Sequence, residues 1–422
     1  MSTPTARLVD LLAANRSDGR GGITSVCTAH PVAIGAALEL ARERGQLALI
    51  EATCNQVNQF GGYTGMHPAD FVRLVRDAGA DLAQTVLGGD HLGPQPWRSE
   101  SGDAAMAKAE EMVAEYVAAG FTKIHLDCSM RCADDPDVLP EGTIATRAAR
   151  LARAAEAARN NDQPLCYVIG TEVPPPGGMG AGHAIEPTAP AAVAVTIQAH
   201  RRAFAAAGAE AAFAKVVAIV VQPGVEFGNE DVVHFDAAAA APLARAVATL
   251  PDGMVYEAHS TDYQRPAAYA GLVRSHFGIL KVGPAATFAL REALFALEAI
   301  ETELVEPDAR SRLSPIVEAV MFAHPQQWQG HYSGSAQQQH YLRRFSLSDR
   351  IRYFWTDPAI AGAVAKLRAN LQRTGLPLTL VSQHFPQHFE AVRDGRAAAT
   401  ADSLCRANIK SALVPYADAT AL

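Results

Sequence analysis

Short apolar runs alternate with segments of helical periodicity through the first part of the chain. Eight such runs occur before the pattern stops. Strands that alternate with helices are joined by right-handed crossovers and form a parallel sheet. Eight strands can close into a barrel, so the pattern predicts an α/β protein with a (β/α)8 TIM barrel. The predicted strands cover residues 22–27, 47–52, 84–89, 123–128, 165–171, 216–222, 254–258 and 277–282.

The segments between the runs have the spacing of amphipathic helices. In residues 103–119, one helical face carries Ala109, Met112, Val113, Tyr116 and Val117. Gly120 follows at the point where this helix should end. An open doubly wound sheet is the alternative, but it normally has a Gly-rich phosphate loop after its first strand. Residues 25–31 (SVCTAHP) form no such loop.

The alternation of strands and helices stops near residue 305. Residues 1–305 are therefore assigned to the barrel, and residues 306–422 are expected to form a helical C-terminal extension packed on it. No low-complexity linker separates the two, so an independently moving second domain is not expected. The extension is a candidate contact with a neighbouring subunit of a homo-oligomer.

Composition excludes several classes of function. Hydrophobic residues make up 49% of the chain, enough for a large core. The net charge of −8 argues against nucleic acid or an anionic membrane as the main partner. No apolar run is long enough to span a bilayer, and the six cysteines are too few for a disulfide scaffold. These features predict a cytoplasmic enzyme.

Polar residues collect at the carboxyl ends of the predicted strands, where barrel enzymes carry their active sites. Each one alone is explained as a loop residue or a satisfied core group. Ionisable residues at nearly all eight ends are harder to explain, because desolvated charges cost free energy. A bound cation and an anionic, hydroxyl-rich ligand would compensate the cost of desolvating these charges. The residues are Cys27, His30, Glu51, Asn55, Asp90, His91, His125, Asp127, Glu172, Gln222, His259 and Lys281.

His91 and His259 are the best candidates for metal ligands. They follow the third and seventh strands, which face each other across the barrel mouth, so both imidazoles can reach one ion. Glu172 or Asp127 would supply an oxygen ligand, and Asp90 is placed to move a proton beside the metal. The alternative is that the imidazoles donate hydrogen bonds to loop carbonyls.

Several long and unusual motifs are distributed along the chain. They are IEATCNQVNQFGGYTGM (50–66), GGDHLGP (88–94), KIHLDCSM (123–130), IGTEVPPPGG (169–178), IVVQPGVEF (219–227), VYEAHSTDYQ (255–264), KVGPA (281–285) and SLSDRIRYFW (346–355). These motifs resemble the GatZ/KbaZ family, the Z subunits of D-tagatose-1,6-bisphosphate aldolase. The likeness covers nearly the whole chain, and the barrel is more distantly similar to the zinc-dependent class II aldolases.

The resemblance implies roles for residues of the site. Asp90 matches the catalytic aspartate of class II aldolases, and His91 matches the metal-binding histidine that follows it. His259 matches the metal histidine of the seventh strand, and Asp127 matches an acidic position near the metal. The metal implied is zinc.

The remaining matches include two departures from the pattern of class II aldolases. Glu172, with Gly177 and Gly178 beyond it, resembles the catalytic Glu and Gly-Gly loop. Gln222 stands where those aldolases have a third histidine, and a Gln oxygen is a poorer zinc ligand than imidazole. Ser260, Thr261 and Asp262 replace a Gly-Gly-Ser motif, so the grip on phosphate is expected to differ.

The family implies breakdown of galactitol, N-acetylgalactosamine or tagatose. Tagatose 1,6-bisphosphate is cleaved there to dihydroxyacetone phosphate and glyceraldehyde 3-phosphate, with a smaller catalytic Y subunit as the partner of the Z subunit. This chain is therefore expected to act as a metal-dependent aldolase or as an accessory subunit. Breaking and re-forming the same bond with the aldehyde turned over would instead give a ketohexose 4-epimerase.

Members of the family have also been labelled tagatose-6-phosphate kinases. A phosphate-binding GxxxxGK[ST] loop would require a Gly-Lys pair, and the chain has none. The Gly-Ala-Gly-Asp motif of ribokinase-like enzymes is missing too, because Gly180-Ala181-Gly182 is followed by His183. The sequence therefore gives little support to a kinase.

Substrate contacts are expected from residues around the predicted mouth. The segment 54–65 is rich in amides suited to sugar hydroxyls, and segment 174–182 is interpreted as a mobile loop over the pocket or an ordinary surface loop. Lys281 is interpreted as a charge partner for a carboxylate or phosphate, with a Schiff-base lysine as the alternative. The predicted substrate-binding residues are Glu51, Asn55, Gly177, Gly178, Ser260, Asp262 and Lys281.

Overall fold

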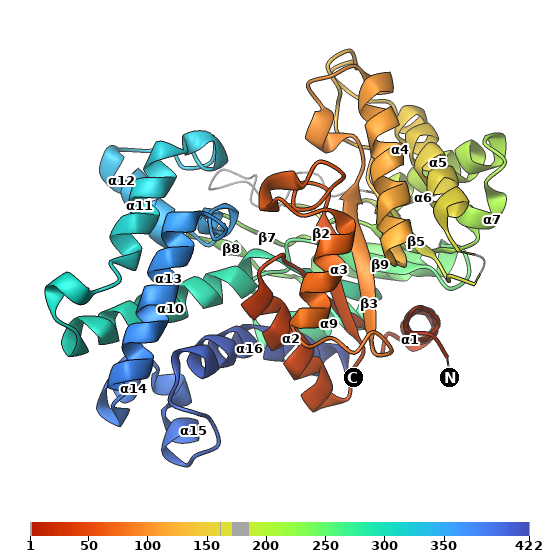
Figure 1. Ribbon diagram of the computed structural model, residues 1–422. Coiled ribbons are helices and arrows are strands. Elements are labelled where there is room, and N and C mark those ends of the chain that lie inside the picture. Colours follow the sequence, from red (N-terminus) through yellow and green to blue (C-terminus); the bar gives the residue numbers. More distant parts are fainter. Residues whose placement is uncertain (1, 161, 171–184, 422) are drawn as a thin grey trace.

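The computed structural model describes residues 2–160, 162–170 and 185–421. Eight strands form a closed parallel barrel in the order β1-β10-β9-β6-β5-β4-β3-β2 (Figure 1). Every predicted apolar run coincides with one of them, so the predicted (β/α)8 barrel is confirmed. The barrel strands are β1 (Ile23–Cys27), β2 (Ala48–Thr53), β3 (Thr85–Leu92), β4 (Lys123–Leu126), β5 (Cys166–Gly170), β6 (Val216–Val220), β9 (Val255–Ala258) and β10 (Phe277–Val282).

Helices surround the barrel and continue into the C-terminal extension. Among the described residues, none of them is long and apolar enough to cross a membrane. The helices are α1 (Pro4–Asp18), α2 (Pro31–Arg44), α3 (Pro68–Asp77), α4 (Gly102–Ala119), α5 (Glu141–Ala158), α6 (Pro190–Ala206), α7 (Glu210–Phe213), α8 (Ala237–Ala246), α9 (Pro266–Arg274), α10 (Pro284–Leu304), α11 (Leu313–Ala323), α12 (Ala336–Phe345), α13 (Pro358–Thr374), α14 (Leu378–His384), α15 (Phe389–Arg393) and α16 (Ala401–Thr420).

Helix α1 closes the amino-terminal end of the barrel and was not predicted from the strand pattern. Thr3 caps the helix by accepting a hydrogen bond from the amide of Ala6, and α1 lies against β3, β9 and β10. Its residues Leu8 and Leu12 are fully buried in one apolar cluster with strand residues such as Leu49 and Val255. This end of the barrel is therefore apolar, and the polar residues lie at the opposite end.

The C-terminal extension lies beside the barrel and then returns to it. Helices α11 to α15 extend to one side in Figure 1, whereas α16 packs against α2, α9 and α10. Leu404, Ile409 and Leu413 of α16 are buried there, and the side-chain amide of Asn408 donates to the carbonyl of Ala289 at 2.8 Å. The last helix is thus part of the layer of helices around the barrel. The domain boundary at residue 305 stays a prediction.

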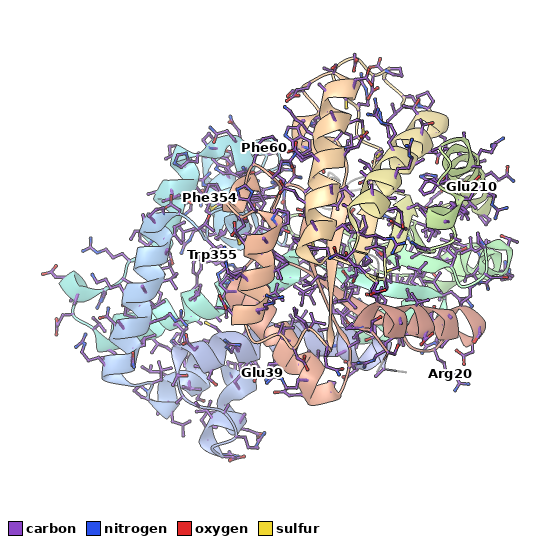
Figure 2. The ribbon with its side chains drawn as sticks, turned by 45° about the vertical axis from the view of Figure 1, so that its right-hand side comes forward. Arg20, Glu39, Phe60, Glu210, Phe354 and Trp355 are labelled. Atoms are coloured by element: carbon purple, nitrogen blue, oxygen red, sulfur yellow. The ribbon has the colours of Figure 1, made fainter. Side chains whose placement is uncertain are left out.

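The extension also packs on loops of the barrel mouth. Trp355 meets the ring of His30 edge-on, with ring centroids 6.0 Å apart, and Tyr353 contacts Tyr63 at 4.8 Å. His30 follows β1 and Tyr63 lies in the loop after β2, so the extension covers this side of the mouth. Figure 2 shows Phe354 and Trp355 where the two parts meet.

Candidate metal centre

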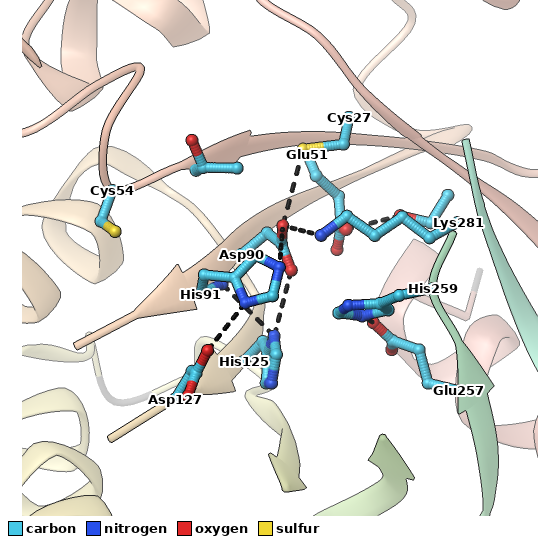
Figure 3. Close-up of polar contacts among 12 residues, drawn as sticks. Cys27, Glu51, Cys54, Asp90, His91, His125, Asp127, Glu257, His259 and Lys281 are labelled. Atoms are coloured by element: carbon cyan, nitrogen blue, oxygen red, sulfur yellow. Dashed lines mark hydrogen bonds and ion pairs between the residues drawn. The ribbon is translucent and has the colours of Figure 1, made fainter. Parts of the chain in front are cut away.

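The carboxyl ends of β3, β4, β9 and β10 bring seven polar side chains together at the barrel mouth (Figure 3). In parallel strands these ends share one rim, so residues far apart in sequence become neighbours. The third strand is longer than predicted and continues to Leu92, whereas β4 stops one residue before Asp127. The cluster consists of Asp90, His91, His125, Asp127, Glu257, His259 and Lys281.

The structure brings the two predicted metal ligands together. The ring centroids of His91 and His259 lie 4.9 Å apart, and His125 lies between 5 and 6 Å from each, at 5.1 and 5.5 Å. The side chain of His91 is 18% exposed, whereas His259 is fully buried. Solvent and ligands therefore reach this pair of histidines from the barrel mouth on the side of His91.

A carboxylate holds each of the two imidazoles. Asp127 Oδ2 lies 2.8 Å from His91 Nδ1, and Glu257 Oε1 lies 2.9 Å from His259 Nε2. Metal-binding histidines almost always have such a partner, which fixes the tautomer and the ring orientation. The nitrogens that would bind a metal are therefore Nε2 of His91 and Nδ1 of His259.

The charge states of these groups suit metal binding. Burial lowers the pKa of His259 well below its usual value, and the nearby charges of Lys281 and His91 act in the same direction, so the ring is neutral. Burial disfavours the Asp127 carboxylate, but hydrogen bonds with His91 and Ser129 and the charges of His91 and His125 together lower its pKa. A metal ligand must be a neutral imidazole or an ionised carboxylate, and His259 and Asp127 meet these conditions.

Two overlapping sets of side chains have ligand atoms close enough to surround one ion. The sets are Asp90, His125, Glu257 and His259, and His91, His125 and Asp127, with all ligand atoms of a set within 4.8 Å of one another. Imidazole nitrogens and carboxylate oxygens are the donors that zinc takes in catalytic sites. The donor types present therefore fit a divalent metal, with His91 in one set, His259 in the other and His125 common to both.

Asp90 is surrounded by four polar side chains and has no exposed surface. It forms an ion pair with Lys281, and its Oδ1 lies 3.0 Å from His125 Nδ1. The thiol of Cys27 and Nε2 of His91 each lie 3.6 Å from Oδ2. Burial alone would raise the pKa of Asp90, but the charges of His91 and Lys281 lower it well below the usual value. Asp90 is therefore ionised at neutral pH.

Lys281 is the charge partner of Asp90. Burial would lower the pKa of the amine, but the charge and hydrogen bond of Asp90, together with the charges of Cys27 and Glu51, raise it. A Schiff-base lysine needs a lowered pKa so that the amine is neutral and nucleophilic. The arrangement thus favours the charge partner over the Schiff base.

His125 carries hydrogen-bond acceptors on both ring nitrogens. Asp90 Oδ1 lies 3.0 Å from Nδ1, and the carbonyl oxygen of Gly170 lies 2.9 Å from Nε2. Burial opposes a charge on the ring, but the hydrogen bond with Asp90 and the charges of Asp90, Asp127 and Glu257 together raise the pKa of His125. The backbone amide of His91 also points at Nδ1, at 3.3 Å. His125 thus supports the carboxylate of Asp90 from the floor of the site.

A buried network of ion pairs and hydrogen bonds lies beneath the histidines. Lys123 Nζ lies 2.8 Å from Glu51 Oε1 and 2.9 Å from Glu257 Oε2, and Ser25 donates to the other oxygen of Glu51 at 2.5 Å. None of these four residues has exposed surface. Glu51, expected to bind substrate, thus lies inside the barrel with both oxygens on protein partners, and Lys123 connects it to the carboxylate that holds His259.

Lys123 and Glu257 were not identified from the sequence. The available signal was their period of two with His125 and His259, which places each pair on one face of its strand. Lys123 is also one of only six lysines in the chain, and it lies at the start of an apolar strand. That period shows which residues share a face, but not which residues of other strands they meet.

The other predicted site residues lie around this cluster. The side-chain oxygen of Gln222, its ligand atom in a metal site, accepts from the amides of Gly224 and Val225 at 2.8 and 2.9 Å. The hydroxyl of Ser260 donates a hydrogen bond to the carboxylate of Glu226 at 3.3 Å. Glu226 lies on a short hairpin of β7 (Glu226–Phe227) and β8 (Val232–Val233), which was not predicted. Asn55 is half-buried in the loop after β2.

Asp262 is buried behind the mouth. Its carboxylate accepts hydrogen bonds from the amides of Gly283 and Ala285, at the start of α10. The predicted residues Glu172, Gly177 and Gly178 and the whole segment 174–182 lie outside the described residues.

Comparison with known proteins agrees with the resemblance seen in the motifs. The model of the GatZ/KbaZ-like family, described as D-tagatose-1,6-bisphosphate aldolase subunit GatZ/KbaZ-like, matches residues 8–421. The subunit GatZ of D-tagatose-1,6-bisphosphate aldolase from Salmonella dublin is 48% identical over 414 residues, which cover 96% of this chain and 97% of the relative. The GatZ of Klebsiella pneumoniae is 48% identical over 417 residues, with the same coverage.

A solved structure is similar over most of the chain. It is titled a "probable tagatose 6 phosphate kinase" from Sinorhizobium meliloti 1021, with 49% sequence identity and a TM-score of 0.88. The match covers 94% of this chain and 100% of that one. With the family match over nearly its whole length, the chain belongs to the GatZ/KbaZ-like family of D-tagatose-1,6-bisphosphate aldolase subunits.

Proposed function

We propose that this chain is a subunit of a D-tagatose-1,6-bisphosphate aldolase and that its barrel mouth carries a metal-dependent retro-aldol site. The site would act on the C3–C4 bond of a ketohexose phosphate. The observation that carries the proposal is the pair His91 and His259, each held by a carboxylate, beside the buried and ionised Asp90. The family and the names of its relatives support the class of substrate.

His91 and His259 would hold the divalent cation, which is most simply zinc because of the nitrogen-rich donor set. When bound, the metal would supply a Lewis acid for the C2 carbonyl of the sugar. Asp127 and Glu257 keep the two rings oriented for this task.

Asp90 is the proposed base for the C4 hydroxyl. It is ionised, so it can accept the hydroxyl proton as the C3–C4 bond breaks. Lys281 and His125 fix the orientation of its carboxylate from two sides. Cleavage of tagatose 1,6-bisphosphate in this way gives dihydroxyacetone phosphate and glyceraldehyde 3-phosphate.

A ketohexose 4-epimerase is the second candidate, because re-forming the bond after the aldehyde has turned over requires the same residues. Asp262 favours this candidate, since its carboxylate occupies donors that a second phosphate of a bisphosphate would use. A kinase has less support, although the S. meliloti relative carries that name. The chain has no Gly-Lys pair for a phosphate loop.

The proposed partners follow from the family. We expect a smaller catalytic Y subunit, a homo-oligomer of this chain, and a cytoplasmic location, for which the six free cysteines are suited. If the Y subunit carries out the cleavage, the barrel of this chain acts as its stabilising partner.

Turnover by the isolated chain tests the proposal. The zinc-loaded chain is assayed for cleavage of tagatose 1,6-bisphosphate and for 4-epimerisation of tagatose 6-phosphate, with and without the Y subunit. Asp90→Asn should lower the turnover by roughly 10²–10⁴-fold, the usual contribution of a positioned base. The exposed Asp137→Asn is the matched control. Unchanged turnover in Asp90→Asn would refute a retro-aldol site in this barrel.

A further inference from the structure

The amino-terminal end of α10 lies at the barrel mouth, beside the proposed site. The helix begins at Pro284, directly after β10, and Lys281 of that strand pairs with Asp90. A helix of this length presents unpaired amides and a positive dipole end at its start, which together bind anions. In barrel enzymes, phosphate commonly binds at such a helix, between the loops after the seventh and eighth strands.

The amides at this helix start are already used. The Oδ1 atom of Asp262 accepts from the amide of Gly283 at 3.1 Å and from the amide of Ala285 at 2.8 Å. Pro284 has no amide hydrogen, and the amide of Ala286 donates to the carbonyl of Gly283 at 3.3 Å. The carboxylate of Asp262 therefore takes the donors that a phosphate would need.

Asp262 is fixed in this position. The preceding Thr261 donates to the carbonyl of Lys281 at 2.5 Å and lies 3.2 Å from the hydroxyl of Tyr416 in α16. Ser260 and Tyr263 have φ angles of 52° and 63°, in the left-handed region that side chains other than glycine rarely adopt. This tightly bent loop holds the carboxylate against the helix.

A second acidic side chain adds negative charge at the same helix start. Asp349, from the C-terminal extension, accepts a hydrogen bond from Thr287 in the first turns of α10 at 2.6 Å, and it is buried. The charge of Arg352 acts on both carboxylates, and that of Arg291 acts on Asp349, so the negative charge here is partly balanced. The occupied amides of Gly283 and Ala285 are therefore the main obstacle to a phosphate at this position.

We propose that Asp262 is a specificity-determining residue that fills the anion position at the start of α10, so that the end of the sugar held there carries a hydroxyl group instead of a phosphate. This inference rests on the proposed function of the mouth as a ketohexose site. The preferred substrate of this barrel is then a ketohexose with a single phosphate at its far end.

Calorimetric binding to the zinc-loaded chain tests the proposal, with tagatose 6-phosphate and tagatose 1,6-bisphosphate as ligands. The wild-type chain should bind the monophosphate at least about tenfold more tightly, as expected when like charges are brought together. Asp262→Ser frees the amides of Gly283 and Ala285, so it should narrow this ratio at least about tenfold and gain binding of inorganic phosphate. Asp262→Asn keeps an acceptor for both amides but loses the charge, so its preference for the monophosphate should lie between those of the wild type and Asp262→Ser.

Equal or tighter binding of the bisphosphate by the wild-type chain would overturn the proposal, even if Asp262→Ser does not fold. An unchanged ratio in a folded Asp262→Ser variant, checked by circular dichroism, would also overturn it. If the wild-type chain binds neither sugar, the proposed function is wrong. Binding of inorganic phosphate then still tests the role of Asp262. Phosphate that binds to Asp262→Ser but not to the wild type supports this role, and the same phosphate affinity in both proteins refutes it.

Discussion

The imidazole rings of His91 and His259 lie 4.9 Å apart between their centroids, although β3 and β9 stand on opposite sides of the barrel. Each ring is oriented by a different carboxylate, Asp127 for His91 and Glu257 for His259. Two rings held in this way need little reorganisation to take up one cation, which is the physical basis of the proposed site.

Glu257 is predicted to position His259 for the metal. Glu257→Gln removes the negative charge that holds the ring, and changes to such partners of metal-binding histidines typically cost about 10–100-fold in metal affinity. The zinc affinity, measured by competition with a chelating dye, should fall by this factor. The matched control, Glu303→Gln on the exposed face of α10, should leave the affinity unchanged. The same affinity in both variants would show that Glu257 has no such role.

Lys123 is predicted to stabilise the interior of the barrel. It pairs with Glu51 and Glu257, and Lys123→Met would leave both carboxylates buried without their common counter-charge. Breaking a buried pair typically lowers the free energy of unfolding by about 3–5 kcal/mol. Urea unfolding checks this, with the exposed Lys366→Met as a control expected within about 0.5 kcal/mol of the wild type. A loss below about 1 kcal/mol in Lys123→Met would contradict the prediction.

Asp262 should make stability depend on pH. Burial raises its pKa to about 6, against about 3.9 for an unperturbed Asp. Because the folded pKa is the higher one, the stabilising contribution is full below about pH 4 and is lost as the pH rises through 6. Asp262→Asn cannot titrate, so the wild type should lose up to about 3 kcal/mol relative to this variant between pH 4 and 7. Urea unfolding at several pH values checks this, and a constant difference between the two chains would contradict it.

The sequence predicts the barrel well because each of its strands is a short, largely apolar run between helix-period segments. It also places Asp90, His91 and His259 at one rim, since parallel strands of a closed barrel all end there. The burial of Glu51 was not predicted, because its position two residues before the end of β2 does not show how far inside the barrel the side chain lies.

Contacts that depend on closure of the fold could not be predicted. Lys123 meets Glu51 and Glu257 across the barrel interior, and strand periodicity shows only which face a residue is on. Tyr416 of α16 reaches Thr261 from the far end of the chain. The packing of α16 against α2, α9 and α10 likewise depends on tertiary contacts that no local sequence pattern encodes.

The metal content of the purified chain tests the central claim most directly. The account predicts about one divalent ion per chain by elemental analysis after zinc loading and dialysis. His91→Ala and His259→Ala should each lose most of this metal, whereas the exposed His324→Ala should retain it. Full metal content in the double variant His91→Ala/His259→Ala, with the fold intact, would contradict the account.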